Sequence, residues 1–387
     1  MCTKPLSIYI HLPFCRSKCP YCAFYSIPNP ADDRIESYID GLIREWQLYK
    51  NQGLIANRHL TTLYLGGGTP SYSSLRQTEK IIRTITADII TAPDIEITIE
   101  ANPDSLTPDK ASNYPSLGIT RLSLGVQSSL DKHLATLGRP HRIDQTLAVL
   151  DHLNTLPYHS FNLDFIFAVP HQSLQDLESD LDLIRRYHPP HLSWYGLSYE
   201  EDTDFFRRYS HRESDEDDEI RFHDMYLKID DQLGEMGYEH YEISNFCRPD
   251  HAGRHNRVYW NQGDYLGLGA SASSYLDGKR FTNPSDIDGY LQQIHTDRLT
   301  YHETFPLSES EQRLEHLFLS LRQAGGLDIS LTADLYRTPK SELLDYIRRA
   351  IPETYRYLLS DRLRLTPEGW LISNSIVLEL EEFLECR

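Results

Sequence analysis

The chain has 387 residues, of which 40% are hydrophobic and 25% are charged. This composition is ordinary for a globular protein and excludes a disordered chain, a collagen-like chain and a small disulfide scaffold. The net charge of −19 argues against non-specific nucleic-acid binding, because attraction to phosphates needs a basic surface. No apolar run approaches about 18 residues and no secretory signal is visible, so we expect a cytoplasmic protein without a membrane-spanning helix.

Short β-rich runs alternate with longer amphipathic runs through the first half of the chain. We expect strands at 7–11, 61–66, 95–101, 120–127, 161–167 and 191–198, and helices at 33–49, 74–90, 108–116, 142–153 and 174–187. Strands that alternate with helices over this length predict a parallel α/β sheet, either open or closed as a barrel.

The pattern changes after residue 200. An acidic stretch at 213–219 opens a predicted long helix that ends near residue 236, and residues 238–283 are rich in Gly, Asn, Tyr and His. Another helix is expected after residue 306, followed by shorter helices. We interpret the final RLRLTPEGWLISNSIVLELEEFL as a strand, a turn, a second strand and a closing helix.

Polar or glycine-rich motifs follow the carboxyl ends of the predicted strands. A histidine and three cysteines follow the first strand, and GGGTPS follows the second. Glu100 and Asn102 close the third strand, Gln127 closes the fourth, and Asp164 lies within the fifth. In α/β barrels the active site forms at this end of the strands. We therefore expect these motifs to share one site.

The cysteine spacing is the strongest single signal. Cys15, Cys19 and Cys22 form a C-x3-C-x2-C pattern, and thiolates suit iron–sulfur clusters, zinc or copper. Three thiolates on a four-iron cube leave one iron open to a small molecule. A structural zinc site needs four protein ligands and would recruit His11, so a zinc-bound, non-redox binding module is the alternative.

IYIHLPFCRSKCPYCAF, YLGGGTPS, EANP, SLGVQS, GRPH and NLDFIF occur in this order. The chain resembles radical S-adenosylmethionine (SAM) proteins of the HemN/HemW group through almost its whole length. The resemblance implies a radical SAM partial TIM-type barrel with a small C-terminal α+β, winged-helix-like domain. It divides the chain into a core barrel at 1–236, a connecting region with an HNRVYW motif at 237–305, and a HemN-type C-terminal domain at 306–387.

The resemblance also implies two cofactors. Cys15, Cys19 and Cys22 would hold a 4Fe-4S cluster, and SAM would bind its open iron. Family members contact SAM at positions that correspond here to Tyr9, Tyr21, Gly67, Gly68, Thr69, Glu100, Gln127, Arg139 and Asp164. Carboxylates suit the ribose and ammonium groups of SAM, and arginine suits its carboxylate. Taken singly, each residue has a structural alternative, such as a strand-end cap for Glu100 or an ion pair for Arg139.

Two activities compete within this group: an oxygen-independent coproporphyrinogen III oxidase and a haem chaperone that delivers haem to acceptors. Three features favour the chaperone. Phe24 stands where the oxidases carry a further cysteine, and only 14 residues precede Cys15, where the oxidases have an N-terminal extension. HNRVYW (255–260) matches a motif linked to haem binding in the HemW proteins. We expect a chaperone without coproporphyrinogen oxidase activity and name no catalytic residue.

His255 is the predicted haem contact, because imidazole is the usual axial ligand of haem iron. The alternative is a hydrogen-bonded structural histidine, and His251 is a weaker second candidate. Tyr259 and Trp260 would pack on the macrocycle or in the core. The expected partners are haem, a haem-acceptor protein and an electron donor; a membrane-bound acceptor and a homodimer are both compatible with the sequence.

The chain departs from the family pattern at a few positions. Ser273 stands where members often have a histidine, and Ala168 replaces a glycine after the fifth strand. We interpret Cys247 as a passive thiol in preference to a second haem contact. Cys2 and Cys386 lie near the ends of the sequence and receive no role.

Overall fold

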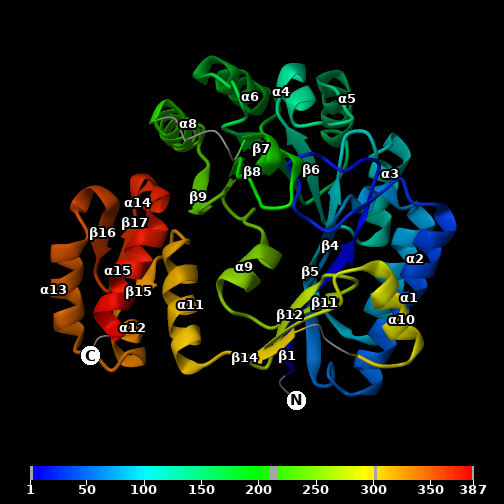
Figure 1. Cartoon of the computed structure of the whole chain (residues 1–387). Coiled ribbons are helices and arrows are strands. Elements are labelled where there is room, and N and C mark those ends of the chain that lie inside the picture. The colour runs from blue at the N-terminus through cyan, green and yellow to red at the C-terminus, as the bar shows by residue number, and fades with distance from the viewer. Residues whose placement is uncertain (1–2, 210–215, 300–302, 386–387) are drawn as a thin grey trace.

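The computed structural model describes residues 3–209, 216–299 and 303–385, so Cys2 and Cys386 lie outside the described residues. A twelve-stranded sheet dominates it, in the order β14-β13-β12-β11-β1-β4-β5-β6-β7-β8-β10-β9. The neighbours from β11 to β8 pair in parallel, and in Figure 1 this part of the sheet curves around helix α9. The predicted parallel α/β sheet is confirmed.

Each predicted strand and helix of the first half is present, with bounds that differ by a few residues. The parallel strands are β1 (Lys4–Leu12), β4 (Arg58–Gly67), β5 (Ile90–Ala101), β6 (Arg121–Gln127), β7 (Ser160–Phe167), β8 (His191–Gly196) and β11 (Tyr265–Leu268). The helices are α1 (Asp32–Asn51), α2 (Leu75–Asp88), α3 (Pro108–Asn113), α4 (Asp131–Thr136), α5 (Ile143–Leu153), α6 (Leu174–Tyr187), α7 (Asp204–Tyr209) and α8 (Glu216–Glu235).

Antiparallel strands extend the sheet at both edges. β10 (Asn245–Cys247) and β9 (Glu239–Glu242) continue it beyond β8, whereas β12 (Ser273–Leu276), β13 (Lys279–Thr282) and β14 (Glu303–Pro306) continue it beyond β11. Two further helices lie in this region, α9 (Arg254–Trp260) and α10 (Ile287–His295). Residues from 239 to 306 therefore contribute strands to the same sheet as the first half of the chain.

Helical periodicity explains how the helices cover the sheet. The buried face of α1 carries Ile35, Tyr38, Ile39, Leu42, Trp46 and Tyr49 at spacings of three and four residues. Each large apolar side chain buried this way stabilises the fold by about 1.5–3 kcal/mol. Among the described residues, no helix has the length and hydropathy needed to cross a bilayer.

The last eighty residues form a smaller unit. It contains α11 (Glu309–Leu321), α12 (Ile329–Leu335), α13 (Lys340–Ala350), α14 (Pro367–Leu371) and α15 (Ser373–Glu385), with a sheet of β15 (Leu327–Asp328), β17 (Arg362–Leu365) and β16 (Arg356–Leu359). The unit packs against the edge of the large sheet: the ring of Trp370 lies 4.3 Å from that of His240, edge to face. Figure 1 shows this unit in orange and red beside β9.

In the closing stretch the first strand and the closing helix are confirmed, whereas the expected second strand is wrong. The hairpin pairs β16 with β17, and the residues after β17 are helical. The side chain of Thr366 accepts a hydrogen bond at the start of α14, and Pro367 occupies its first turn. Both are helix-start signals, and the buried Ile376, Leu380 and Leu384 recur at helical spacing.

A buried carboxylate joins three elements at one edge of the barrel. Glu45 on α1 is fully buried and accepts hydrogen bonds from Gly269 N (2.8 Å), the Asn283 amide (2.7 Å) and the Tyr290 hydroxyl (2.7 Å). Burial raises the pKa of Glu45 to about 7, although these hydrogen bonds oppose the rise. The carboxylate therefore ties α1 to the turn after β11 and to α10.

Tyr290→Phe removes one of these hydrogen bonds without changing the ring. The bond lowers the pKa of Glu45 and so favours the ionised carboxylate. We expect a loss of about 1.5–3 kcal/mol in the free energy of unfolding at pH 8, and a smaller loss at pH 5.5, where Glu45 is protonated. Urea unfolding at both pH values measures this loss.

Tyr357→Phe, at a tyrosine that is 52% exposed, is the control and should change stability by less than about 0.5 kcal/mol. An equal loss at both pH values would contradict the assigned role of Glu45.

Candidate functional site

A cavity of about 610 Å³ lies inside the curved part of the sheet. Alternate residues of four neighbouring strands line it: Glu96, Thr98 and Glu100 from β5; Arg121, Ser123, Gly125 and Gln127 from β6; Asn162, Asp164 and Ile166 from β7; His191, Ser193 and Tyr195 from β8. Residues two apart along a strand point to the same face of the sheet. Closed barrels fill their interior with bulky branched residues, whereas these faces are mostly polar or small and leave space.

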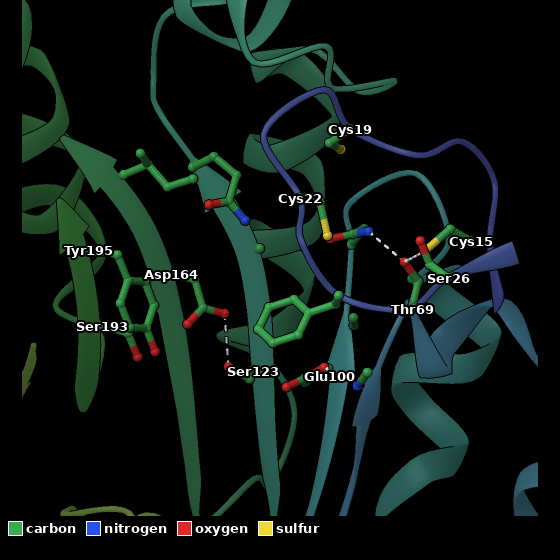
Figure 2. Close-up of a pocket in the computed structure, with 18 of the residues that line it drawn as sticks. Cys15, Cys19, Cys22, Ser26, Thr69, Glu100, Ser123, Asp164, Ser193 and Tyr195 are labelled. Atoms are coloured by element: carbon green, nitrogen blue, oxygen red, sulfur yellow. Dashed lines mark hydrogen bonds between the residues drawn. The ribbon is translucent and has the colours of Figure 1, made fainter. Parts of the chain in front are cut away.

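The three motif cysteines lie at the carboxyl-end rim of this cavity. Cys15 ends the short strand β2 (Phe14–Cys15), and Cys19 and Cys22 belong to the loop that follows, where Cys22 N donates to Cys19 O at 3.1 Å. Figure 2 shows all three cysteines above Glu100 and Asp164. Burial raises the pKa of the Cys15 and Cys22 thiols, so the loop favours neutral thiols until a cationic group binds.

The zinc alternative would require His11 to give up one of its hydrogen bonds. His11, the fourth ligand of that alternative, has both ring nitrogens engaged. Nδ1 lies 3.0 Å from the Tyr9 hydroxyl and Nε2 lies 3.1 Å from the carbonyl oxygen of Tyr25.

Asn102 joins the surroundings of two cysteines. Its amide donates to the Thr69 hydroxyl at 2.9 Å, and that hydroxyl donates to Cys15 Sγ at 3.5 Å. Its carbonyl oxygen accepts from Arg139, which also donates to Cys19 Sγ at 3.5 Å. The sequence analysis identifies Asn102 only as a residue at a strand end. Its position directly after Glu100 and Ala101 was the available signal that it belongs to the site.

Two buried carboxylates face the cavity below the cysteines. Glu100 accepts from the Tyr64 hydroxyl at 2.8 Å and from Gly67 N at 3.0 Å, and burial raises its pKa to about 7. Asp164 accepts from the Ser123 hydroxyl at 2.9 Å and from the Asn162 amide at 2.8 Å, and burial raises its pKa as well. Both carboxylates are held in place by donors, which suits recognition of hydroxyl or cationic groups.

Eight of the nine predicted SAM contacts line the cavity; they are Tyr21, Gly67, Gly68, Thr69, Glu100, Gln127, Arg139 and Asp164. Tyr9 is not among the lining residues. Its ring stacks on Tyr64 with centroids 6.0 Å apart, and its hydroxyl contacts His11. Gln127 ends β6 with a φ of 67°, at a register shift that re-aims its side chain at the rim.

The HNRVYW motif forms α9, at the opposite end of the cavity from the cysteines. Glu96 on β5 accepts hydrogen bonds from the backbone N–H groups of Arg254 (3.2 Å) and His255 (2.9 Å), which anchors the first turn of this helix. His255 is 2% exposed and lines the cavity. Its Nδ1 lies 2.7 Å from the Thr62 hydroxyl and its Nε2 lies 2.8 Å from the Tyr259 hydroxyl.

Several lining residues were missed in the sequence analysis. Arg121, Ser123, Asn162, His191, Ser193 and Tyr195 all line the cavity. The signal was present, because RLSLGVQ alternates polar or small residues with apolar ones inside a strand expected to be buried on both faces. Such alternation in a buried parallel strand indicates a polar interior. His251 does not line the cavity, and its ring lies 5.5 Å from that of His159.

Sequence comparisons assign the chain that forms this cavity to a family. The Radical SAM superfamily profile matches residues 9–184. A relative from Lactococcus lactis, named heme chaperone HemW, is 32% identical over 385 residues, which cover 99% of this chain and 98% of the relative. The chain belongs to the HemW family. The HemW of Escherichia coli is 31% identical over 98% of both chains, and that of Synechocystis is 35% identical over 88% of this chain and 83% of its own.

A solved structure agrees with this assignment at the level of the fold. Coproporphyrinogen III oxidase HemN from Escherichia coli, described as a radical SAM enzyme, superposes with a TM-score of 0.82 at 22% identity. The match covers 99% of this chain and 91% of HemN. The predicted radical SAM fold is confirmed. Membership of the superfamily implies SAM and a 4Fe-4S cluster.

The residues of this HemW-family chain fit both groups. Three free thiols lie on one loop at the rim, and two of them receive hydrogen bonds from Thr69 and Arg139. Donors to thiolate sulfur are the usual surroundings of iron–sulfur ligands. Below the loop, glycine backbone, two carboxylates and an arginine face the cavity, which matches the ribose, ammonium, carboxylate and adenine groups of SAM.

Gly68 sets how closely the cysteine loop approaches β4. A Cβ atom on Gly68 would lie 2.8–2.9 Å from backbone atoms of Pro13 and Phe14, which precede Cys15. We expect Gly68→Ala to lower the free energy of unfolding by about 1–3 kcal/mol in urea titrations, because backbone must shift.

Gly234→Ala is the matched control. Gly234 lies on α8 with nothing within 4 Å of an added Cβ, so alanine should be neutral or stabilise by up to about 1 kcal/mol. Equal stability of the two variants would contradict the close approach at Gly68.

Proposed function

We propose that this chain is a haem chaperone, which binds haem and transfers it to an acceptor protein, and that it carries a SAM-ligated 4Fe-4S cluster. Similarity to proteins named heme chaperone HemW over nearly the whole chain carries the proposal. The cavity supports it, because the cysteine loop and the HNRVYW motif line its two ends.

In this proposal Cys15, Cys19 and Cys22 hold the cluster. When bound, the cluster would supply an open iron for SAM. Glu100 and Asp164 orient the ribose and ammonium groups, while Arg139 attracts the carboxylate. Gly67, Gly68 and Thr69 bring backbone and a hydroxyl close to the ligand, and Tyr21 and Gln127 complete its surroundings. Tyr9 acts through His11 and Tyr64, since it does not line the cavity.

The chain's own hydrogen bonds support His255 as the haem ligand. The Thr62 hydroxyl donates to Ser7 Oγ at 2.7 Å, so its oxygen is free to accept a hydrogen bond from His255 Nδ1–H. Nε2 then carries the lone pair, which accepts from Tyr259. Burial lowers the pKa of His255 to about 3, so its ring is neutral at physiological pH. Neutral imidazole is the form that binds iron, and Nε2 must exchange the Tyr259 hydroxyl for the metal.

The proposal includes a cellular location and partner proteins. We expect the chain to act in the cytoplasm with an electron donor for the cluster and a haem-acceptor protein, which is either another cytoplasmic protein or a membrane-bound one. The division into 1–236, 237–305 and 306–387, and a homodimer, stay predictions.

Haem transfer is the direct test of this function. Anaerobically reconstituted protein should bind one haem per chain and pass it to an apo-acceptor, as followed by absorption. It should not convert coproporphyrinogen III in the presence of SAM and reductant. Cys19→Ser should lose the bound iron. Formation of protoporphyrinogen would replace the proposal by the oxidase, whose fold this chain shares.

His255 and Tyr259 give opposite expectations for haem affinity. His255→Ala should weaken haem binding at least about ten-fold, because the axial ligand is lost. Tyr259→Phe keeps the ring but removes the hydroxyl that competes for Nε2, so it should bind haem more tightly. Absorption titrations measure both, and the iron–sulfur spectrum should stay unchanged. Equal affinity of His255→Ala and the unmodified chain would reject the ligand assignment.

A further inference from the structure

Arg121 is a buried cation that the cofactor assignments leave unused. It begins β6, is 6% exposed and lines the cavity. Its Nη1 donates to the Ser160 hydroxyl at 3.1 Å and to the carbonyl oxygen of His251 at 3.0 Å. Within the described ranges, these are its hydrogen bonds, and no carboxylate pairs with it. A buried guanidinium without a negative partner is costly, so such groups normally face a counter-charge.

The acidic groups nearby are committed elsewhere. Glu96, on the adjacent strand, accepts from the backbone N–H groups of Arg254 and His255. Asp164 accepts from Ser123 and Asn162. The ring of His191, which also lines this part of the cavity, contacts Asn162 Oδ1 and the Tyr241 hydroxyl, each at 2.7 Å. Burial raises the pKa of Asp164, and Arg121, which attracts this carboxylate at longer range, opposes the rise. The free side of the Arg121 guanidinium faces the cavity.

Arg121 lies two residues below Ser123, the register partner of Glu100, and so further from the cysteine loop than the carboxylates assigned to SAM. Gln127, six residues further along β6, reaches the rim, and a parallel strand rises about 3.3 Å per residue, so the two ends of β6 are about 20 Å apart. Arg121 belongs instead to the α9 end of the cavity. It holds the backbone of His251, four residues before His255, and its Nη2 lies 3.8 Å from the Cβ position of Gly253.

We propose that Arg121 is the anchor for a ligand carboxylate at the α9 end of the cavity and, resting on the proposed haem function, that this carboxylate is a haem propionate. Haem presents its iron and its propionates at separate points. His255 on α9 and Arg121 on β6 both line the cavity, so they offer a ligand for the iron and a charge for a propionate. Guanidinium is suited to this task because it remains charged when buried and binds carboxylates in a bidentate manner.

A comparison of haem with haem dimethyl ester isolates the contribution of the propionate carboxylates to binding. The unmodified chain should bind haem at least about ten-fold more tightly than the ester, in absorption titrations in one detergent buffer. Arg121→Gln should bind the two equally, Arg121→Lys should keep part of the preference, and SAM affinity should be unchanged in both variants. Arg356→Gln is the matched control, because Arg356 is 8% exposed and lies in the C-terminal unit. Arg356→Gln should keep the full preference for haem over its dimethyl ester.

The outcomes distinguish this inference from the function on which it rests. Equal binding of haem and ester by the unmodified chain would overturn the anchor while leaving the chaperone intact, and this comparison does not depend on how any variant folds. A preference that survives in Arg121→Gln would also overturn it. Absence of haem binding by the unmodified chain would overturn the proposed function, and the propionate assignment with it.

Discussion

The structure depends on a constraint inside its barrel: the inward faces of β5 to β8 carry polar side chains that must all find partners. An unsatisfied polar group in a protein interior costs about 1–3 kcal/mol, and an unpaired charge costs more. Most of these side chains meet the constraint through one another, as Asp164 does with Ser123 and Asn162. The apolar alternates on the same strands face the helices and build the core. One pattern of alternation therefore creates both the packed exterior of the barrel and its hollow, polar interior.

This arrangement separates the cavity into two ends with different chemistry. The rim carries soft sulfur ligands on a loop, supported by Thr69, Asn102 and Arg139. The floor carries imidazole and guanidinium on or beside α9, held by rigid strands. Glu100 and Asp164 lie between the two ends. A loop suits a cluster that must be assembled in place, whereas a ligand held by rigid elements meets groups that are already oriented.

Much of this organisation was predictable from the sequence, and the failures have physical causes. Strand ends followed by polar motifs located the rim, because parallel strands bring their carboxyl ends together, as with Glu100 and Gln127. The exclusion of Tyr9 from the cavity could not be predicted in this way, because Tyr9 shares the inward strand face with its register partner Tyr64, and only the packing of the Tyr64 ring and His11 against it separates it from the cavity. The hydrogen bonds of His255 depend on Thr62, almost two hundred residues away, which no local pattern reveals. The second strand of the closing stretch was wrong because the buried apolar residues after Pro367 recur at helical spacing.

Glu96 has a consequence for how the two ends of the cavity communicate. It belongs to β5, the same strand that carries Glu100, and its carboxylate holds the first turn of α9. A ligand that displaces α9 therefore acts on one end of a strand whose other end faces the rim. If occupancy of one end changes the affinity of the other, linkage requires the reverse effect to be equal in free energy. β5 is thus the element through which the cysteine end and the α9 end of the cavity would sense each other's state.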